Sequence, residues 1–207
     1  MNNLLSKQLL EKIADRSVHV LLGLSATSCQ GKWLKCKITI DDTIIFNDTI
    51  ESYRELEFEK TCVDPKTSIS IVIDSKDDSG TTVDSNGNVL ENQSISITKC
   101  EINGANIIDN GYIYNGKYTM VLNEAKEKHY KELGFSLEHN DYNFYENSIW
   151  TLVLPVPALA GIIQSVRKLE EYETVQYSNI IDEIITRIDD DNSNRISNKK
   201  INRHTSR

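Results

Sequence analysis

The sequence of 207 residues lacks the short motifs that mark most catalytic sites. It contains no glycine-rich phosphate loop, no dinucleotide-binding fingerprint, no nucleophile elbow and no H-E-x-x-H zinc motif. Its four histidines stand far apart and in no recognisable catalytic context: His19, His129, His139 and His204. We therefore predict that the protein is not an enzyme, although a glycosidase needs only two carboxylates, and the 31 acidic residues leave such a pair open.

Cysteine is also scarce, and its spacing is unlike that of zinc sites. The four cysteines form no C-x-x-C pair and have no clustered histidines beside them: Cys29, Cys36, Cys62 and Cys100. Because no signal peptide is recognisable, we expect synthesis in a reducing cytoplasm and buried free thiols rather than disulfides. No apolar run approaches the ~20 residues that span a bilayer, so we expect no membrane partner and no structural metal of the zinc type.

Acidic residues outnumber basic residues in the chain as a whole, but not at the C-terminus. The net charge is −8, yet residues 195–207 carry five basic residues and no acidic one, so the rest of the chain carries −13. An acidic surface disfavours nucleic acid as a partner, because phosphates require a dense basic surface. We predict a basic, disordered tail over residues 192–207, with docking of this tail onto a complementary charged partner as the alternative.

What the sequence does contain is a series of short runs in which apolar and polar residues alternate. This period of two is typical of strands with one buried face. Short turn-forming segments, such as Asp41-Asp42, separate the runs and favour antiparallel neighbours. The pattern predicts a mostly β protein, an antiparallel, jelly-roll-like β-sandwich over residues 18–157. The five clearest runs are Trp33–Ile40, Thr43–Ile50, Leu56–Cys62, Ser68–Ile73 and Ser94–Ile102.

On both sides of this domain lie segments whose apolar residues have helical spacing. Residues 3–16 predict an N-terminal helix within a segment 1–17, and residues 158–191 predict a C-terminal helical arm after Pro157. The arm carries a stripe of isoleucines that we expect to mediate assembly, by packing on the N-terminal helix or another subunit; packing on the chain's own sheet is the alternative. The stripe consists of Ile180, Ile181, Ile184, Ile185 and Ile188.

The connection Asp74–Gln93 is long, acidic and without a convincing strand pattern. Such a loop in a compact domain is usually functional or mobile. Asp77, Asp78 and Asp84 could supply oxygen ligands to calcium, which binds several oxygens at once. The segment departs from the helix-loop-helix calcium pattern, however, so a solvated turn is the alternative interpretation. No other cofactor is expected.

Aromatic residues are concentrated late in the chain, with nine of the 15 between residues 112 and 150. A helix is predicted over residues 123–133, and a buried last strand over Ser148–Leu154. Flat aromatic faces stack on sugar rings and anchor protein interfaces. We select Tyr112, Tyr114 and Trp150 as candidate ligand contacts, and a place in the core of a loop-rich end is the alternative.

The order of these segments resembles a known group of modules. The stretch Trp33–Ile50, the acidic connection Asp74–Asn92, Ile95–Gly104, the segment Tyr114–Tyr118 and the closing Trp150 strand together resemble small jelly-roll modules in virion proteins of contractile-tailed bacteriophages. Those modules are in turn similar to calcium-dependent, xylan-binding carbohydrate modules. The resemblance covers roughly residues 30–157 and rests on strand order.

This resemblance implies a structural component of a bacteriophage virion, in baseplate, neck, tail or head surface. The partners would then be other virion proteins in an oligomeric assembly, and the location would be the virion after synthesis in the host cytoplasm. The alternative function is a carbohydrate-binding module that binds a glycan through the acidic loop and the aromatic residues. In those modules calcium-chelating aspartates and nearby aromatics hold the sugar.

Overall fold

The computed structural model describes residue 11 and residues 14–168 and 170–171. The chain divides into two compact units, residues 1–164 and residues 165–207, and the sandwich lies in the first. Most of the predicted helix over residues 3–16 falls outside the described residues. The isoleucine stripe and the predicted basic tail do so entirely.

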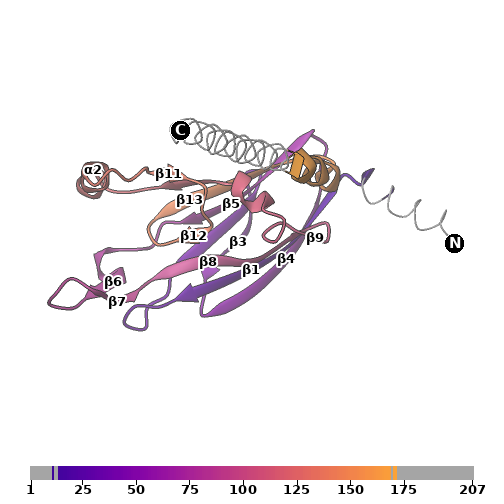
Figure 1. Ribbon diagram of the computed structural model, residues 1–207. Coiled ribbons are helices and arrows are strands. Elements are labelled where there is room, and N and C mark those ends of the chain that lie inside the picture. The colour runs from indigo at the N-terminus through magenta and orange to yellow at the C-terminus, as the bar shows by residue number, and fades with distance from the viewer. Residues whose placement is uncertain (1–10, 12–13, 169, 172–207) are drawn as a thin grey trace, which may run out of the picture. The chain divides into compact units, whose positions relative to one another are not determined.

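The sandwich consists of two antiparallel sheets that face each other (Figure 1). In the first sheet the strand order is β12-β8-β1-β4, with β9 paired to the end of β8. The bounds of these strands are β1 Ser17–Thr27, β4 Tyr53–Thr61, β8 Ser94–Ile102, β9 Ala105–Asn106 and β12 Asn143–Phe144.

The second sheet has six strands in the order β11-β10-β13-β5-β2-β3. Along the chain, successive segments pass back and forth between the two sheets, so the topology is jelly-roll-like rather than a simple meander. The predicted mostly β, antiparallel sandwich is confirmed. The bounds are β2 Lys35–Ile40, β3 Thr43–Thr49, β5 Lys66–Ile73, β10 Lys117–Met120, β11 Glu138–His139 and β13 Ser148–Pro155.

The hydrophobic core is formed by the apolar residues that alternate with polar residues along the strands. In β5 the side chains of Ile69, Ile71 and Ile73 are buried, whereas Ser70 and Val72 between them lie on the outer face. In β8 the alternation changes phase at Thr98, because a bulge pairs Gly23 of β1 with Lys99 and the next residue with Ile97. The four cysteines are free and buried, as predicted.

Two segments differ from the prediction. The connection Asp74–Gln93 is not a structureless loop: it contains a short 3₁₀ turn (η1, Asp78–Gly80) and a hairpin of β6 (Thr81–Val83) and β7 (Val89–Asn92). Strand β1, which is not among the five clearest runs of the sequence, spans Ser17–Thr27 at the centre of its sheet. It pairs with β4 on one side and with β8 on the other.

Helices are few in the described part of the chain. The predicted helix over residues 123–133 is confirmed as α2, Glu124–Glu132, and a second 3₁₀ turn, η2, spans Tyr112–Asn115. A further helix begins at residue 158, as expected for the start of the arm, with Ala158 and Ile162 buried. None of the described helices is long and apolar enough to cross a membrane.

The turn between β2 and β3 ties the two sheets together. The Asp41 carboxylate accepts hydrogen bonds from the Ser68 amide at 2.8 Å and from the Thr67 hydroxyl at 3.0 Å, both in β5. It also contacts Nζ of Lys60, which belongs to β4 in the other sheet, at 2.6 Å. Burial alone would raise the pKa of this carboxyl, but the hydrogen bonds from Lys60, Ser68 and Thr67 outweigh burial and lower the pKa to about 2.

The depressed pKa of Asp41 predicts a loss of stability in acid. Its folded-state value of about 2 lies below the ordinary 3.8, so its contribution is complete above about pH 4 and disappears as the pH falls towards 2. Because the side chain is 41% exposed, solvent screens the contacts, and we expect a contribution of about 1 kcal/mol. Denaturant unfolding of wild type and Asp41→Asn across this pH range measures it.

The stability difference between wild type and Asp41→Asn should therefore be largest near neutrality and close to zero near pH 2. Asp42→Asn is the matched control, because Asp42 is the neighbouring turn residue and is exposed. A difference for Asp41→Asn that stays constant with pH would contradict the assignment.

Candidate ligand-binding site

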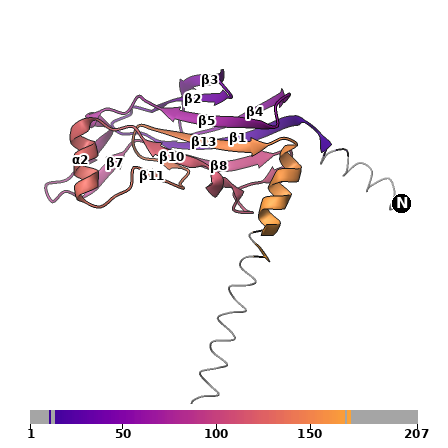
Figure 2. The ribbon, with the colours of Figure 1, turned by 90° about the horizontal axis from the view of Figure 1, so that it is seen from above.

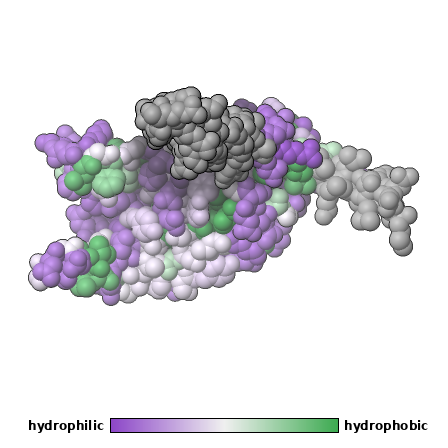
Figure 3. Space-filling view, in the orientation of Figure 1, coloured by the Kyte–Doolittle hydropathy of each residue, from purple (hydrophilic) through white to green (hydrophobic). Residues whose placement is uncertain are grey.

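The candidate site lies at the end of the sandwich that carries α2 and the β6–β7 hairpin, opposite the end where residue 158 starts its helix (Figures 1 and 2). Apolar surface gathers at this end over both elements (Figure 3). The exposed apolar residues there are Val83, Val89 and Leu90 of the hairpin and Leu133 and Phe135 after α2, each more than half exposed. Exposed apolar clusters of this kind often mark binding surfaces.

A cleft of about 340 Å³ opens beside α2. We call it the aromatic cleft, because four of its lining residues are tyrosine or phenylalanine. Ligand sites are commonly concave and apolar with a few polar groups, and range over roughly 300–1,000 Å³. The lining residues are Tyr118, Met120, Tyr130, Phe135, Ser136, His139, Asn143, Tyr145 and Glu146.

Local pairing explains how these rings meet. Tyr118 of β10 pairs across the ladder with His139 of β11, and their ring centroids lie 4.4 Å apart. The Tyr118 ring also lies 5.6 Å from that of Phe144 and is only 2% exposed, so it forms the floor. Tyr130 and Phe135, on the two sides of the turn after α2, have centroids 5.9 Å apart and form a wall. Tyr145 is 52% exposed and is the most accessible tyrosine of the cleft.

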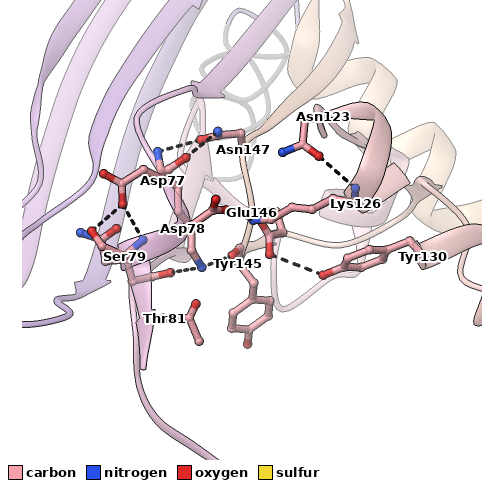
Figure 4. Close-up of polar contacts among 12 residues, drawn as sticks. Asp77, Asp78, Ser79, Thr81, Asn123, Lys126, Tyr130, Tyr145, Glu146 and Asn147 are labelled. Carbon is pink, nitrogen blue, oxygen red and sulfur yellow. Dashed lines mark hydrogen bonds and ion pairs between the residues drawn. The ribbon is translucent and has the colours of Figure 1, made fainter. Parts of the chain in front are cut away.

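Glu146 is the acidic group of the cleft. Its Oε1 accepts a hydrogen bond from the Tyr130 hydroxyl at 3.5 Å, and its Oε2 lies 3.4 Å from Nζ of Lys126. Nζ of Lys126 also lies 3.4 Å from Asp78, so one ammonium bridges two carboxylates. Figure 4 shows Glu146 facing Tyr130, while the ring of Tyr145 points away from the polar contacts.

These contacts change the proton affinity of the groups around Glu146. Burial acts to lower the pKa of Lys126, but the charges of Glu146 and Asp78 outweigh burial and raise the pKa. Burial, followed by the charge of Glu146, raises the pKa of the Tyr130 hydroxyl. Glu146 therefore faces a cation and a protonated phenol, an arrangement that holds a carboxylate in place.

Helix α2 rests on polar contacts. Asn123 caps its N-terminus by accepting a hydrogen bond from the Lys126 amide at 2.9 Å, and Gly134 ends it in a left-handed conformation with φ of 78°. None of its nine residues is buried. The helix is held to the sandwich through Lys126 and Tyr130, the residues that contact Glu146.

A second, more polar cavity of about 240 Å³ shares Glu146 with the aromatic cleft. Its lining includes Lys76, Asp77, Asp78, Lys126 and Asn147. Lys76 is only 8% exposed, and its Nζ donates to Asn92 Oδ1 at 2.6 Å, to the Gln93 carbonyl at 3.1 Å and to the Tyr145 carbonyl at 2.5 Å. Burial lowers the pKa of this ammonium, and the charge of Glu146 partly offsets the effect.

The three aspartates predicted as calcium ligands have separate local roles. Asp77 accepts from the Ser79 amide at the start of η1, Asp78 contacts Lys126, and Asp84 accepts from the Asn86 and Asn88 amides in the turn of the hairpin. Within the described residues, no three or more His, Cys, Asp or Glu side chains gather as a metal site. The structure thus does not bring Asp77, Asp78 and Asp84 together as one ligand set.

The three aromatic residues predicted as ligand contacts also fail to form one exposed surface. Tyr112 is 6% exposed and Trp150 is 1% exposed, so both pack in the core, as the alternative interpretation stated. Trp150 lies on the same buried face of β13 as Leu152, and its ring has no surface to present to a ligand. Tyr114 is 51% exposed but does not line the cleft.

None of the three predicted aromatic contacts lines the aromatic cleft, but the cleft lies in the part of the chain that the sequence analysis singled out for its aromatic residues. Tyr118, Tyr130, Phe135 and Tyr145 all fall inside the aromatic-rich segment 112–150. Their grouping depends on the pairing of β10 with β11, which spans a helix and a turn. No short-range pattern indicates that pairing.

Comparison with known proteins finds two solved structures and no family. No family model and no curated protein matches the chain. A structure titled "vCBM60 in complex with galactobiose" has a TM-score of 0.35 and 9% identity, covering 64% of this chain and 95% of its own. A selenomethionine form of vCBM60, from work on two families of calcium-dependent carbohydrate-binding modules, has a TM-score of 0.37 and 10% identity, covering 65% and 88%. Both structural neighbours are carbohydrate-binding modules, and neither likeness assigns this chain to a family.

Proposed function

We propose that the protein is a non-catalytic binding module that takes a glycan in the aromatic cleft. The observation that carries this proposal is the cleft itself, in which tyrosine and phenylalanine rings surround a fixed carboxylate. Sugar rings present flat C–H faces that pack on aromatic rings, together with hydroxyl groups that need polar partners. Tyr145 and Phe135 offer exposed rings, and Asn143, Ser136 and Glu146 offer polar atoms.

The acidic groups support binding rather than hydrolysis. Among the described residues that line the cleft, Glu146 is the one carboxylate, and its two oxygens face Tyr130 and Lys126. Glycosidases of the usual kind place two carboxylates on opposite sides of the scissile bond. Glu146 is therefore suited to orient a ligand hydroxyl.

Tyr145→Ala is expected to weaken glycan binding by about tenfold or more, because removal of an aromatic anchor from a cleft commonly has an effect of this size. Tyr53→Ala is the matched control, since Tyr53 is also a tyrosine with 52% exposure but lies on β4, outside the cleft. A glycan array identifies the best glycan, and titration calorimetry of that glycan and of galactobiose gives the affinities.

Two results would contradict the proposal. One is that the folded wild-type protein binds no glycan on the array. The other is an equal loss of affinity in Tyr145→Ala and Tyr53→Ala. Titration in the presence and absence of calcium also tests the predicted use of this ion, because binding that needs calcium should disappear with a chelator.

A role in assembly, including the predicted place in a bacteriophage virion, is the second candidate. The observation that favours contact with other chains is the edge of the six-stranded sheet, where β3 has no further strand beside it in the described part of the chain and exposes Ile44 and Ile45. Unpaired strand edges readily add a further strand. A monomeric mass for the purified protein, both alone and mixed with the proteins encoded beside it, would contradict this candidate.

A further inference from the structure

A buried ammonium stands next to the aromatic cleft. The side chain of Lys76 enters the fold three residues after β5 ends and is only 8% exposed. Gly80 leaves room for it, because a Cβ at residue 80 would lie 2.9 Å from Cγ of Lys76. The local structure is thus built around this lysine.

All three hydrogen-bond acceptors of Nζ are uncharged. They are the Asn92 side-chain oxygen and the carbonyl oxygens of Gln93 and Tyr145. An ammonium that leaves water without a carboxylate in direct contact carries a large desolvation cost, which only good oxygen partners can offset. A neutral side chain would fill the same space at a lower cost. The positive charge is therefore best explained by the three oxygen atoms that it holds together.

The three acceptors come from two segments that are remote from Lys76 in the sequence. Asn92 and Gln93 end the β6–β7 hairpin, whereas Tyr145 lies between β12 and β13. A second link fixes the same junction: the Lys76 amide donates to Asn147 Oδ1 at 2.8 Å, and Asn147 Nδ2 donates to the Lys76 carbonyl at 2.8 Å. Lys76 thus binds the residues on both sides of Glu146, through the backbone carbonyl of Tyr145 and the side chain of Asn147.

We infer that Lys76 is a positioning residue for the aromatic cleft, and that its ammonium fixes the wall that presents Tyr145 and Glu146 to a ligand. This inference rests on the proposed function of the cleft. Lys76 performs the task that a bound cation performs elsewhere, namely gathering carbonyl oxygens from separate loops around one positive charge. A tethered ammonium does so without loss to solvent.

Lys76→Met tests the inference, because methionine keeps an apolar stem and removes the charge. Amide hydrogen exchange should rise by about tenfold or more at this junction, since three buried or partly buried hydrogen bonds are lost. The reporting amides are those of Val121, which donates to Asn147, and of Gln93, which donates to Gly80. The Ser68 amide, which donates to Asp41 at the opposite end of β5, should be unchanged.

Affinity for galactobiose, or for the glycan best retained on the array, should fall by about tenfold or more in Lys76→Met. Asp41→Asn is the matched control: it lowers stability at the other end of the sandwich and should leave affinity unchanged. Unchanged exchange at Val121 and Gln93, or a uniform rise that includes Ser68, would overturn the inference. If no glycan binds even the wild type, the proposed function fails, while the exchange pattern still decides the role of Lys76.

A rescue experiment covers the case in which Lys76→Met does not fold. Lys76→Ala lacks the last three carbons and the ammonium, which n-propylammonium can replace. We expect this ion to restore protection of Val121 and Gln93 at least in part, and tetramethylammonium at the same concentration to have no effect, because it has no N–H to donate. Equal effects of both ions would overturn the inference.

Discussion

Replacing Trp150 with alanine is expected to lower the free energy of unfolding by about 3–5 kcal/mol, the range typical of a fully buried aromatic side chain. Trp150 is 1% exposed and lies in β13 between Tyr118 of β10 and Ile71 of β5. The free energy of unfolding of domains of this size is only about 5–15 kcal/mol, so the substitution would remove a large share of the total stability. Denaturant unfolding followed by circular dichroism measures it, because Trp33 complicates fluorescence.

Val153→Ala is the control for Trp150→Ala. Val153 lies in the same strand, but its side chain points outward and is 51% exposed. We expect a change below about 1 kcal/mol for this exposed position. Similar losses of stability at both positions would contradict the assignment of Trp150 to the buried face of β13 and of Val153 to its exposed face.

Gly116→Ala is expected to have the second largest effect, a loss of about 2–3 kcal/mol from overpacking. The backbone of Gly116 has an ordinary φ of −69°, so any residue could adopt it. The limit is space: a Cβ there would overlap Nε1, Cε2 and Cζ2 of the Trp150 indole. The same denaturant unfolding measures the loss, and the indole explains why residue 116 is glycine.

The cause of the Gly116→Ala effect can be isolated with a second change. Phenylalanine at residue 150 lacks the part of the indole that the new Cβ would meet, so Trp150→Phe should relieve the clash. The double variant should be more stable than the sum of the single losses predicts, by about 1 kcal/mol or more. Strict additivity would contradict steric overlap. Trp150→Phe also removes an indole N–H that has no hydrogen-bond partner among the described residues, which reduces the cost of this substitution.

The strands that were predicted well are those with one buried face. Ser94–Ile102 was predicted with its observed bounds, and β5 and β13 within two residues, because burial imposes the alternation that the sequence displays. The β6–β7 hairpin was missed for the same reason. Its apolar residues Val83, Val89 and Leu90 are 55–66% exposed, so neither of its faces is selected by a core.

The site could be located only to a region of the chain. Trp150 could have been assigned to the core, since it shares the face of Leu152 and Leu154 in an alternating strand. The grouping of Tyr118 with His139 depends on long-range pairing that no short window contains. Lys76 looks like an ordinary surface lysine in an acidic loop, because its burial results from segments that lie far away in sequence.

The absence of buried side chains in α2 separates the proposed recognition of a glycan from folding. Substitutions along this helix can reshape one wall of the cleft without touching the hydrophobic core, and the sandwich would tolerate them as it tolerates changes in other surface segments. Selection for a new ligand could therefore act on α2 with little penalty in stability. The helix is the part of the molecule where natural variants, or an engineer, can alter specificity first.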